Sequence, residues 1–350
     1  MVPPAPVGDD AVETVAIVCD AGPRIGIGHV MRCIALAEEL LSRGLRVVLV
    51  ADVADVPWAS EQVRRRGIVV RQPLPSEPVP AIVASLSPVA VVVDSYLLDA
   101  AVYAELRSRW PLLALTDGDP RGRPADLYLD QNLGAESSVW PLPSGSRHLG
   151  GLAYAQQRRD IVAHRPFAPK PASAEHRPPQ VLAFFGGTDA YGVAPLVTRV
   201  LVATGVPCAL TVIAANPSIE ETLRSLSPAP GQMITVIGPS DSLPSLVADA
   251  DVVLSASGTS AWELFCLGAA VGFVCVADNQ AEAYARMSKE GLAVGVATLD
   301  ELSSDVAGAT ARLRTLLTDA PLRARLRAAV WAKVDGRGPA RVVDALLAMV

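Results

Sequence analysis

The chain is organised around Ile25-Gly26-Ile27-Gly28-His29-Val30-Met31-Arg32-Cys33, a glycine-containing segment near its start. The apolar run before this segment, at residues 14–19, has the β-branched content of a buried strand. The run after it, at residues 29–42, places apolar side chains at helical spacing and is followed by a stop at Gly44. A strand, a glycine loop and a helix in this order predict the first unit of a parallel α/β sheet.

The glycines of this segment and the histidine after them point to a ligand. Gly26 and Gly28 permit backbone conformations and a close approach to a ligand that a β-carbon would forbid. His29 stands at the predicted start of the helix, where anions and polar ligands bind. Because imidazole titrates near neutrality, it can take a proton from water or a hydroxyl. We therefore predict that His29 is a catalytic base; the alternative is a histidine that only hydrogen-bonds to its loop.

Strands and helical segments alternate through both halves of the chain, which predicts the α/β class with two doubly wound, Rossmann-type units. The expected strands are residues 14–19, 46–51, 68–71, 89–94, 112–116 and 127–130, then 181–185, 209–214, 234–237, 252–255, 271–276 and 294–297. Ligands of such sheets bind beyond the carboxyl ends of the strands. The residues to inspect at the ends of the first-half strands are Asp20, Asp94, Ser95, Tyr96, Thr116, Asp117, Asp130, Gln131 and Asn132.

A length of 350 residues favours two domains. The expected division is a flexible arm (1–13), an N-terminal Rossmann-like domain (14–165), a linker (166–180), a C-terminal Rossmann-like domain (181–335) and a terminal helix (336–350) that can cross back to the first domain. The linker is rich in prolines, which stiffen it.

Composition narrows the class of protein. A net charge of −6 without a clustered basic stripe argues against nucleic acid as a partner. The five cysteines lie mostly in apolar runs without CxxC spacing, so we expect reduced thiols and no metal site. The longest uncharged apolar stretch, residues 264–277, is shorter than the roughly 18 to 20 residues of a membrane helix. With no export signal visible, we expect a cytoplasmic monomer or weak dimer that needs no cofactor.

Two segments of the second half predict an anion site. Gly186, Gly187 and Thr188 follow a strand and precede a helix, so their amides can point at phosphate oxygens. The alternative is a tight turn in which Asp189 caps the helix. Ser257, Gly258 and Thr259 repeat the arrangement after another strand.

Glu263 lies one helical turn after this second loop, where a carboxylate can bind both hydroxyls of a ribose. It could equally be a first-turn glutamate that complements the helix dipole. Asn279 and Gln280 end another strand, and their amides can bind a sugar or a phosphate; the alternative is a simple cap. The chain contains no HExxH, GxSxG or Walker A motif, so metalloprotease, serine-esterase and ATPase functions have little support.

Four blocks together resemble one bacterial family. They are Gly26-Ile27-Gly28-His29-Val30-Met31-Arg32-Cys33-Ile34-Ala35-Leu36-Ala37, Asp130-Gln131-Asn132-Leu133-Gly134, Phe185-Gly186-Gly187-Thr188-Asp189, and the segment from Ser257-Gly258-Thr259-Ser260-Ala261-Trp262-Glu263 through Asp278-Asn279-Gln280. In this order they are similar to the UDP-2,4-diacetamido-2,4,6-trideoxy-β-L-altropyranose hydrolases of pseudaminic acid biosynthesis, which have relatives in spore-coat polysaccharide synthesis. The match runs from about residue 14 to about residue 300.

The resemblance implies a GT-B-like fold with the active site between two Rossmann-type domains, and hydrolysis of a UDP-sugar at the anomeric carbon with inversion and release of UDP. It implies that His29 activates the water and that Glu263 holds the ribose. The other positions it implies are Gly186, Gly187, Ser257, Gly258 and Thr259 for phosphate, Ile237 and Gly238 for uracil, and Tyr96 for the sugar. Arg32 is expected either to support the leaving phosphates or to lie on a solvated helix face.

The chain departs from the family pattern at two places. Cys19-Asp20-Ala21 replaces an Arg-x-Asp segment, and Thr116-Asp117-Gly118-Asp119 replaces an Asp-Asp pair. Both lie on the expected sugar side, which points to a different sugar or acceptor. We expect a UDP-sugar hydrolase. The alternatives are a glycosyltransferase in which His29 activates an acceptor other than water, and a subunit that binds UDP-sugar without turnover.

Overall fold

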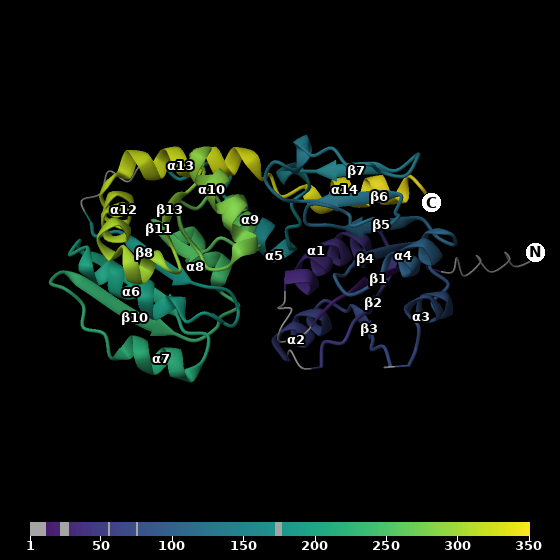
Figure 1. The fold of residues 1–350 in the computed structure, drawn as a ribbon. Helices are drawn as coiled ribbons and strands as arrows, with labels where there is room; N and C mark the ends of the chain where they lie inside the picture. The colour runs from purple at the N-terminus through teal and green to yellow at the C-terminus, as the bar shows by residue number, and fades with distance from the viewer. Residues whose placement is uncertain (1–11, 22–27, 55–56, 75, 172–176) are drawn as a thin grey trace, which may run out of the picture. The chain divides into compact units, whose positions relative to one another are not determined.

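The computed structural model describes residues 12–21, 28–54, 57–74, 76–171 and 177–350 (Figure 1). Gly26, most of the expected arm and part of the expected linker lie outside these residues. Contacts within the chain group it into two compact units. The first contains the chain up to Asp130, Ser137–Gly150 and Pro339–Val350, and the second contains Gln131–Glu136 and Gly151–Gly338.

The first unit is built on a seven-stranded parallel sheet with the order β3-β2-β1-β4-β5-β6-β7. Its strands are β1 (Thr14–Cys19), β2 (Arg46–Val50), β3 (Val69–Arg71), β4 (Ala90–Asp94), β5 (Leu112–Leu115), β6 (Leu127–Asp130) and β7 (Arg147–Gly150). Its helices are α1 (Gly28–Ser42), α2 (Pro57–Arg65), α3 (Val79–Ser85), α4 (Ala100–Arg107) and most of α14 (Gly338–Leu347). The strand order reverses between β1 and β4, so ligands are expected at this pair's carboxyl ends.

The strands of this sheet read as apolar runs because they are covered on both faces. All six residues of β1 and all five of β4 are buried. Helix α1 packs against β1 and β2 through a stripe that includes Val30, Ile34 and Leu40. Burial on both faces removes the polar alternation of a half-exposed strand, which is why the runs were recognisable in the sequence.

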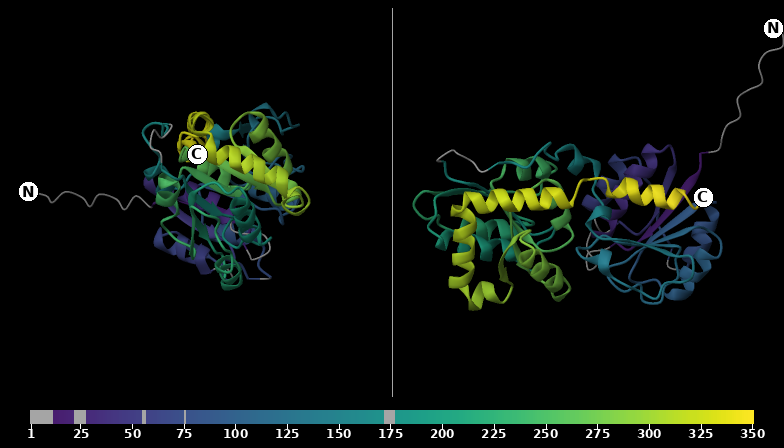
Figure 2. Two further views of the ribbon diagram at one scale, coloured as in Figure 1. Left: turned by 90° about the vertical axis from the view of Figure 1, so that its left-hand side faces the viewer. Right: turned by 90° about the horizontal axis from the view of Figure 1, so that it is seen from above.

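Helix α14 completes the first unit from the far end of the chain (Figure 2). Arg43, just after α1, donates from Nη2 to Oδ1 of Asp344 on α14 at 2.8 Å. The sequence assigned residues 336–350 to a helix that can cross back, and residues 339–350 do cluster with the first unit.

The second unit repeats the plan with six parallel strands in the order β10-β9-β8-β11-β12-β13. They are β8 (Gln180–Phe184), β9 (Cys208–Ile213), β10 (Gln232–Ile237), β11 (Val252–Ala256), β12 (Val271–Cys275) and β13 (Val294–Thr298). The switch point is between β8 and β11. The helical segments are η1 (Ala135–Ser137), η2 (Leu152–Tyr154), α5 (Arg159–Ala163), α6 (Val193–Ala203), α7 (Pro217–Arg224), α8 (Leu243–Asp249), α9 (Ser260–Cys266), η3 (Asp278–Gln280), α10 (Ala281–Lys289), α11 (Glu301–Ser304), α12 (Val306–Thr318) and α13 (Ala320–Lys333).

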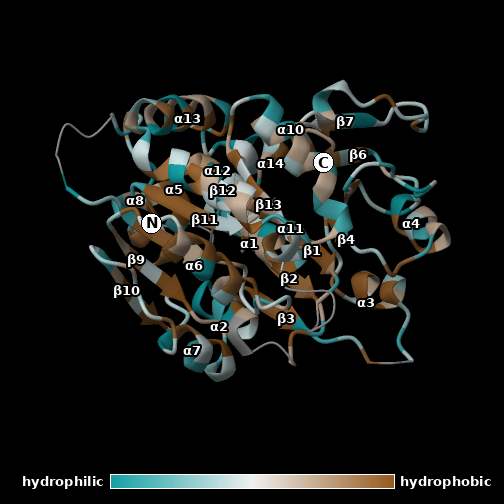
Figure 3. Ribbon diagram, turned by 60° about the vertical axis from the view of Figure 1, so that its left-hand side comes forward, coloured by the Kyte–Doolittle hydropathy of each residue, from teal (hydrophilic) through white to brown (hydrophobic). Residues whose placement is uncertain are grey.

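Each unit has its own apolar core on its sheet, visible as the hydrophobic colour of the central strands in Figure 3. In the second unit one cluster lies between the sheet, α6 and α12, and another lies between the sheet and α9. The fold class predicted from the sequence, two Rossmann-type α/β units, is confirmed.

Two details differ from the sequence expectation. Strand β7 was not predicted because only Leu149 of its four residues is buried, so it carries no apolar run. Residues 131–136 and 151–165 cluster with the second unit instead of the first. The cause is local contact: Gln156 donates its backbone N–H to Oε1 of Gln131 at 2.8 Å, and Ile161 packs in the second unit's core.

No described helix combines the length and the apolar character needed to cross a bilayer.

Gly338, where α14 begins, gives a test of how closely the chain packs against the backbone of Ala155. A Cβ built at this position would lie 2.0 Å from the carbonyl oxygen of Ala155, and neither backbone can move aside cheaply. We expect Gly338→Ala to destabilise the protein by about 2 kcal/mol or more, measured by thermal denaturation. The control is Gly238→Ala, where a Cβ meets nothing within 4 Å. Equal melting temperatures for the two variants would contradict the packing described.

Candidate active site

The first unit gathers polar side chains at the switch point of its sheet. His29 is the second residue of α1, and Asp94 is the last residue of β4, next to β1 in the sheet. The backbone continues this pairing beyond the strands, because Asp20 donates its N–H to the carbonyl of Asp94 at 3.1 Å. The topology alone therefore brings the helix start after β1 to the carboxylate at the end of β4.

His29 and Asp94 form a buried pair. Nδ1 of His29 lies 2.6 Å from Oδ1 of Asp94, with 7% of the histidine and 0% of the aspartate exposed. Because a carboxylate only accepts, Nδ1 is assigned the proton of this contact, and in a neutral ring Nε2 would then carry the free lone pair. This is the tautomer that a general base requires.

Arg32 lies one helical turn after His29 and locks the aspartate in place. Its Nε donates to Oδ2 of Asp94 at 2.5 Å, and its Nη2 donates to Oδ1 at 2.6 Å. Burial opposes ionisation of Asp94, but the charge of Arg32 and the hydrogen bonds from Arg32 and His29 outweigh it and lower the pKa of that carboxyl. Asp94 therefore stays ionised beside the histidine.

Asp117, in the loop after β5, takes the other edge of the same guanidinium. Nη1 of Arg32 donates to its two carboxylate oxygens at 2.9 and 3.1 Å. Burial works against the charge of Arg32, yet the two carboxylates raise its pKa well above the ordinary value. The buried arginine is thus a permanent cation held between two carboxylates.

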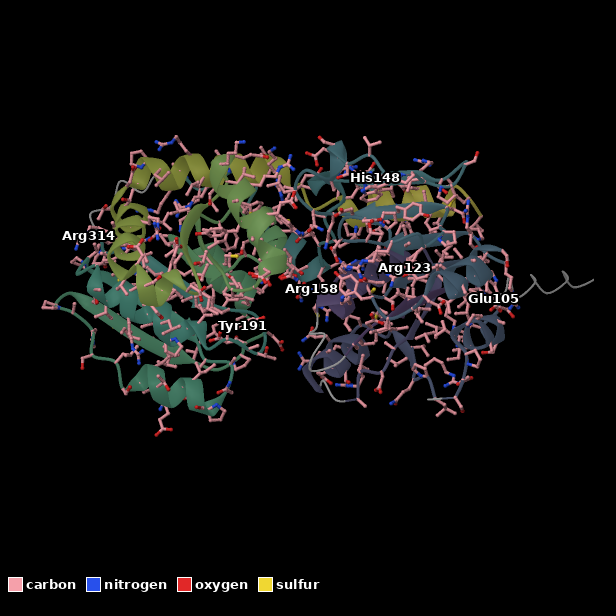
Figure 4. All side chains as sticks on the ribbon, viewed as in Figure 1. Glu105, Arg123, His148, Arg158, Tyr191 and Arg314 are labelled. Atoms are coloured by element: carbon pink, nitrogen blue, oxygen red, sulfur yellow. The ribbon has the colours of Figure 1, made fainter. Side chains whose placement is uncertain are left out.

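Tyr96, predicted on the sugar side, stands against the ring of His29. Its ring meets that of His29 edge to face, with centroids 4.7 Å apart at 87°, and its hydroxyl donates to Oδ2 of Asp117. Burial, the charge of Asp117 and this hydrogen bond raise the pKa of Tyr96, so the hydroxyl remains a donor. The Tyr96 loop is fixed by Asp20, which accepts from its backbone N–H at 2.6 Å, and by Arg123 (Figure 4), which donates to its carbonyl at 2.9 Å.

The position of Arg32 contradicts one of its two sequence expectations, the solvated helix face. It is 6% exposed, so it does not lie on a solvated helix face. Its guanidinium is engaged by Asp94 and Asp117, which leaves little donor capacity for a leaving phosphate. Gly28, the first residue of α1, precedes this cluster directly and is partly exposed.

The second unit presents one exposed loop and one partly buried loop at its own switch point. Gly186, Gly187 and Thr188, after β8, are all exposed, and Gly186 has a φ of 77°. Asp189 accepts from the N–H groups of Val193 at 2.8 Å and Ala194 at 3.0 Å, at the start of α6. Asp189 therefore satisfies first-turn amides of α6, although the N-cap residue itself is Gly192.

The loop after β11 lies against η3. Oγ of Ser257 lies 3.2 Å from Oε1 of Gln280, and that oxygen also accepts from Val276 N–H at 3.2 Å. A Cβ built at Gly258 would lie 3.5 Å from Nε2 of Gln280. Two segments predicted separately from the sequence are therefore brought together. No side chain caps α9 at its N-cap, Thr259, and the N–H groups of Ala261 and Trp262 donate to the carbonyls of Gly258 and Thr259 at 2.9 and 3.4 Å.

Glu263 on α9 is paired with an arginine that the sequence analysis did not single out. Arg158 (Figure 4) donates from Nε and Nη2 to its Oε1 at 3.2 and 3.1 Å. The glutamate side chain remains 20% exposed. Both donors of Arg158 contact the same carboxylate oxygen of Glu263.

The remaining predicted substrate contacts are Ile237, Gly238 and Asn279. Ile237 ends β10 at the sheet edge, and its carbonyl already accepts from the N–H of Ala214 at 2.8 Å. Gly238 follows and is exposed, as is Asn279 in η3. Of the two uracil positions, Gly238 therefore has the more accessible backbone.

Asp94 and Asp117 were recognisable as strand-end residues, but their shared partner was not. Arg158 could not be singled out from the sequence. It belongs to no recognisable motif and directly precedes the short helix α5. Among the described residues, no group of three or more histidine, cysteine, aspartate and glutamate side chains is arranged to hold a metal ion.

Comparison with known proteins establishes the fold but not the family. No protein-family model and no curated protein sequence matches the chain. Solved structures match over nearly its whole length. MurG of Acinetobacter baumannii is 16% identical with a TM-score of 0.68, covering 95% of this chain and 99% of that one. UDP-GlcNAc 2-epimerase from Neisseria meningitidis, bound to UDP-GlcNAc, is 14% identical with a TM-score of 0.63, covering 95% and 99%.

A third structure is spinosyn rhamnosyltransferase SpnG complexed with thymidine diphosphate, which is 16% identical with a TM-score of 0.60 and covers 96% of this chain and 100% of that one. Identities this low show a shared fold only. The chain has the GT-B fold of two Rossmann-type units.

Asp94→Asn tests the buried cluster through stability. At neutral pH we expect a loss of about 3 kcal/mol, because a buried arginine loses a charged partner. Since the folded-state pKa of Asp94 is lowered, its contribution is complete above the ordinary aspartate pKa of about 3.9 and is lost as pH falls below it. Denaturant titrations of both proteins should therefore converge as the pH is lowered from 7 to 3.

The control for this prediction is Asp344→Asn, which removes a carboxylate that is 62% exposed and pairs with Arg43. It should cost less than about 1 kcal/mol. A difference between wild type and Asp94→Asn that stays constant down to pH 3 would contradict the account.

Proposed function

We propose that the chain is a nucleotide-sugar hydrolase that releases UDP from a UDP-sugar by attack of water at the anomeric carbon. The observation that carries this proposal is the 2.6 Å contact between His29 Nδ1 and Asp94 at the switch point of the first sheet. A neutral histidine oriented by an ionised carboxylate is a general base suited to water.

In the proposed reaction, Nε2 of His29 accepts a proton as the water oxygen bonds to the anomeric carbon. The bond between that carbon and the β-phosphate oxygen breaks, and its electron pair leaves with UDP. Attack opposite the leaving group inverts the anomeric configuration. A diphosphate is a good leaving group, so the step needs less general-acid help than a glycosidase gives.

The second unit supports the nucleotide part of the proposal. The exposed Gly186-Gly187-Thr188 loop and the Ser257-Gly258-Thr259 loop lie at the carboxyl ends of β8 and β11, the two strands of the switch point. Backbone amides in such loops stabilise phosphate charge in the ground state and on the leaving group. Glu263, oriented by Arg158, is the proposed ribose ligand.

The names of the structural neighbours agree with this substrate class. One is a UDP-GlcNAc 2-epimerase bound to UDP-GlcNAc, and another is a rhamnosyltransferase complexed with thymidine diphosphate. Because the second is a transferase, an acceptor other than water is the competing proposal, and the same His29 would serve as its base. A subunit that binds without turnover is the third possibility.

One assay distinguishes these functions. The protein is incubated with a panel of UDP-sugars, with and without candidate acceptors, and UDP release and UDP-sugar binding are followed. Release without an acceptor supports hydrolysis, and release only with an acceptor supports transfer. Binding without release would overturn the enzymatic proposal.

His29→Asn should lower UDP release by about 10² to 10⁴-fold while UDP still binds, because the variant loses the base and keeps the nucleotide loops. The measurement is turnover together with calorimetric titration of UDP. His164→Asn is the matched control, since His164 is an exposed histidine that bonds to Asp160 and Ser245 in the second unit. Full turnover in His29→Asn would remove His29 from the mechanism.

Glu263 should determine how strongly the protein prefers a ribose nucleotide to its 2′-deoxy analogue. We expect wild-type protein to bind UDP about tenfold or more tightly than 2′-deoxy-UDP, because the carboxylate loses a hydrogen bond to the missing hydroxyl. Glu263→Gln should reduce this preference in calorimetric titrations. Glu290→Gln, which changes a glutamate paired with Arg286, should leave it intact. Equal discrimination by both variants would place the ribose elsewhere.

A further inference from the structure

A pocket of the first unit lies beside Tyr96 and is lined in part by charged side chains of the segment between β5 and β6. These side chains are Asp117, Asp119, Arg121 and Arg123. Arg121 places its guanidinium carbon 5.1 Å from the centroid of the Tyr96 ring. The same ring meets that of His29 edge to face at 4.7 Å. A guanidinium and the proposed catalytic imidazole therefore contact one tyrosine ring.

The acidic side chains near this pocket are engaged by donors of the protein. Asp117 accepts from the hydroxyl of Tyr96 and from the buried arginine of α1. Asp20 accepts from the backbone N–H of Tyr96 at 2.6 Å. Asp119 accepts through Oδ1 from the backbone N–H of Arg121 at 2.7 Å, and no described residue donates to its other oxygen. Asp119 thus keeps one acceptor for a ligand.

The two arginines that line the pocket use their donors differently. Arg123 (Figure 4) donates from Nη1 and Nη2 to the carbonyls of Ser95 and Tyr96 at 2.8 and 2.9 Å. The side chain of Arg121 makes no hydrogen bond or ion pair with any residue that the structure describes, and it stacks on Tyr96 instead. Arg121 also has a φ of 56°, a strained conformation for a residue other than glycine. Its guanidinium therefore has donors available for an anionic ligand.

We propose that Arg121 determines substrate specificity by binding a carboxylate on the sugar, so that the substrate class is a UDP-linked sugar acid. The identity of the ligand as a UDP-sugar rests on the proposed function. A planar guanidinium donates two parallel hydrogen bonds to a carboxylate, whose geometry it matches. The available oxygen of Asp119 would accept from a hydroxyl of the same sugar.

The preference for a carboxylate should be moderate. Arg121 is exposed, and Asp119 carries a charge of the same sign as the ligand on the same turn. Water and this charge weaken an ion pair without removing its dependence on geometry. A sugar with a hydroxymethyl group at the same carbon would leave the guanidinium without an anionic partner.

The test compares two ligands that differ at one carbon of the sugar. UDP-glucuronate carries a carboxylate where UDP-glucose carries a hydroxymethyl group. Binding is measured by calorimetric titration, and turnover is measured as UDP release. Arg121→Gln removes the charge, whereas Arg121→Lys keeps it. The matched control is Arg109→Gln, because Arg109 is another arginine of the first unit over an aromatic ring, with its guanidinium carbon 4.5 Å from the Trp110 ring centroid.

We expect wild-type protein to bind UDP-glucuronate about tenfold more tightly than UDP-glucose. Arg121→Gln should abolish this preference by weakening the binding of UDP-glucuronate, and Arg109→Gln should retain it. Arg121→Lys should retain part of it, because lysine keeps the charge but not the two-pronged geometry. If Arg121→Gln does not fold, as judged by circular dichroism, Arg121→Asn replaces it, because asparagine tolerates a positive φ.

Two results overturn the proposal: no preference for UDP-glucuronate in wild type, or a preference that survives in the folded Arg121 variant. Turnover separates this proposal from the proposed function. A preference in binding that depends on Arg121, in a protein that releases no UDP, would uphold the role of Arg121 and refute the hydrolase. UDP release with the same kcat/KM for both ligands, in wild type and in Arg121→Gln, would do the reverse.

Discussion

The first unit depends on one buried carboxylate. Asp94 has no exposed surface, yet it carries a charge, because Arg32 neutralises it and His29 donates to it. An ionised carboxylate in an apolar sheet is costly unless its hydrogen bonds are satisfied. The sheet topology satisfies them by placing the start of α1 beside the end of β4. One of the contacts that stabilise this charge also orients the ring of His29 through Nδ1.

The second unit has the same type of topology but different residues at its switch point. Its strand order also reverses at a switch point, but small residues follow β8 and β11 in place of a charged cluster. Gly186 adopts a positive φ that keeps its loop tight, and Ser257 contacts Gln280 from the next strand connection. Backbone amides in such loops bind anions without a net positive charge, which suits a chain whose formal net charge is −6. Under the proposed function, the first unit supplies the base and the second unit binds the phosphates.

Much of this fold could be read from the sequence because its strands are buried on both faces. Runs such as residues 14–19 and 252–255 are continuous in apolar character, and the helices between them leave a parallel sheet as the natural arrangement. Strand β7 could not be read, since a single buried leucine does not make a pattern. His29 could be singled out because its sequence neighbours, a strand and glycines, already define a helix start.

The partners of His29 could be found only in part. Asp94 and Asp117 stand at strand ends, so sheet geometry makes them candidates, but 62 and 85 residues separate them from Arg32. Arg32 lies outside the apolar stripe of its helix, which predicts exposure; tertiary pairing overrides that pattern and buries it. Arg158 is a similar case, because its partner Glu263 is 105 residues away. Local spacing describes elements well, whereas ion pairs between distant segments depend on how the sheet is assembled.

The central claim is that water attacks the anomeric carbon with His29 as its base. The most direct measurement is NMR of the reaction of a UDP-sugar labelled with ¹³C at the anomeric carbon, in water enriched in ¹⁸O. The account predicts that the first free sugar formed has ¹⁸O on that carbon and the inverted anomeric configuration, while UDP remains unlabelled. Label in UDP, or retention of configuration in the first product, would contradict it.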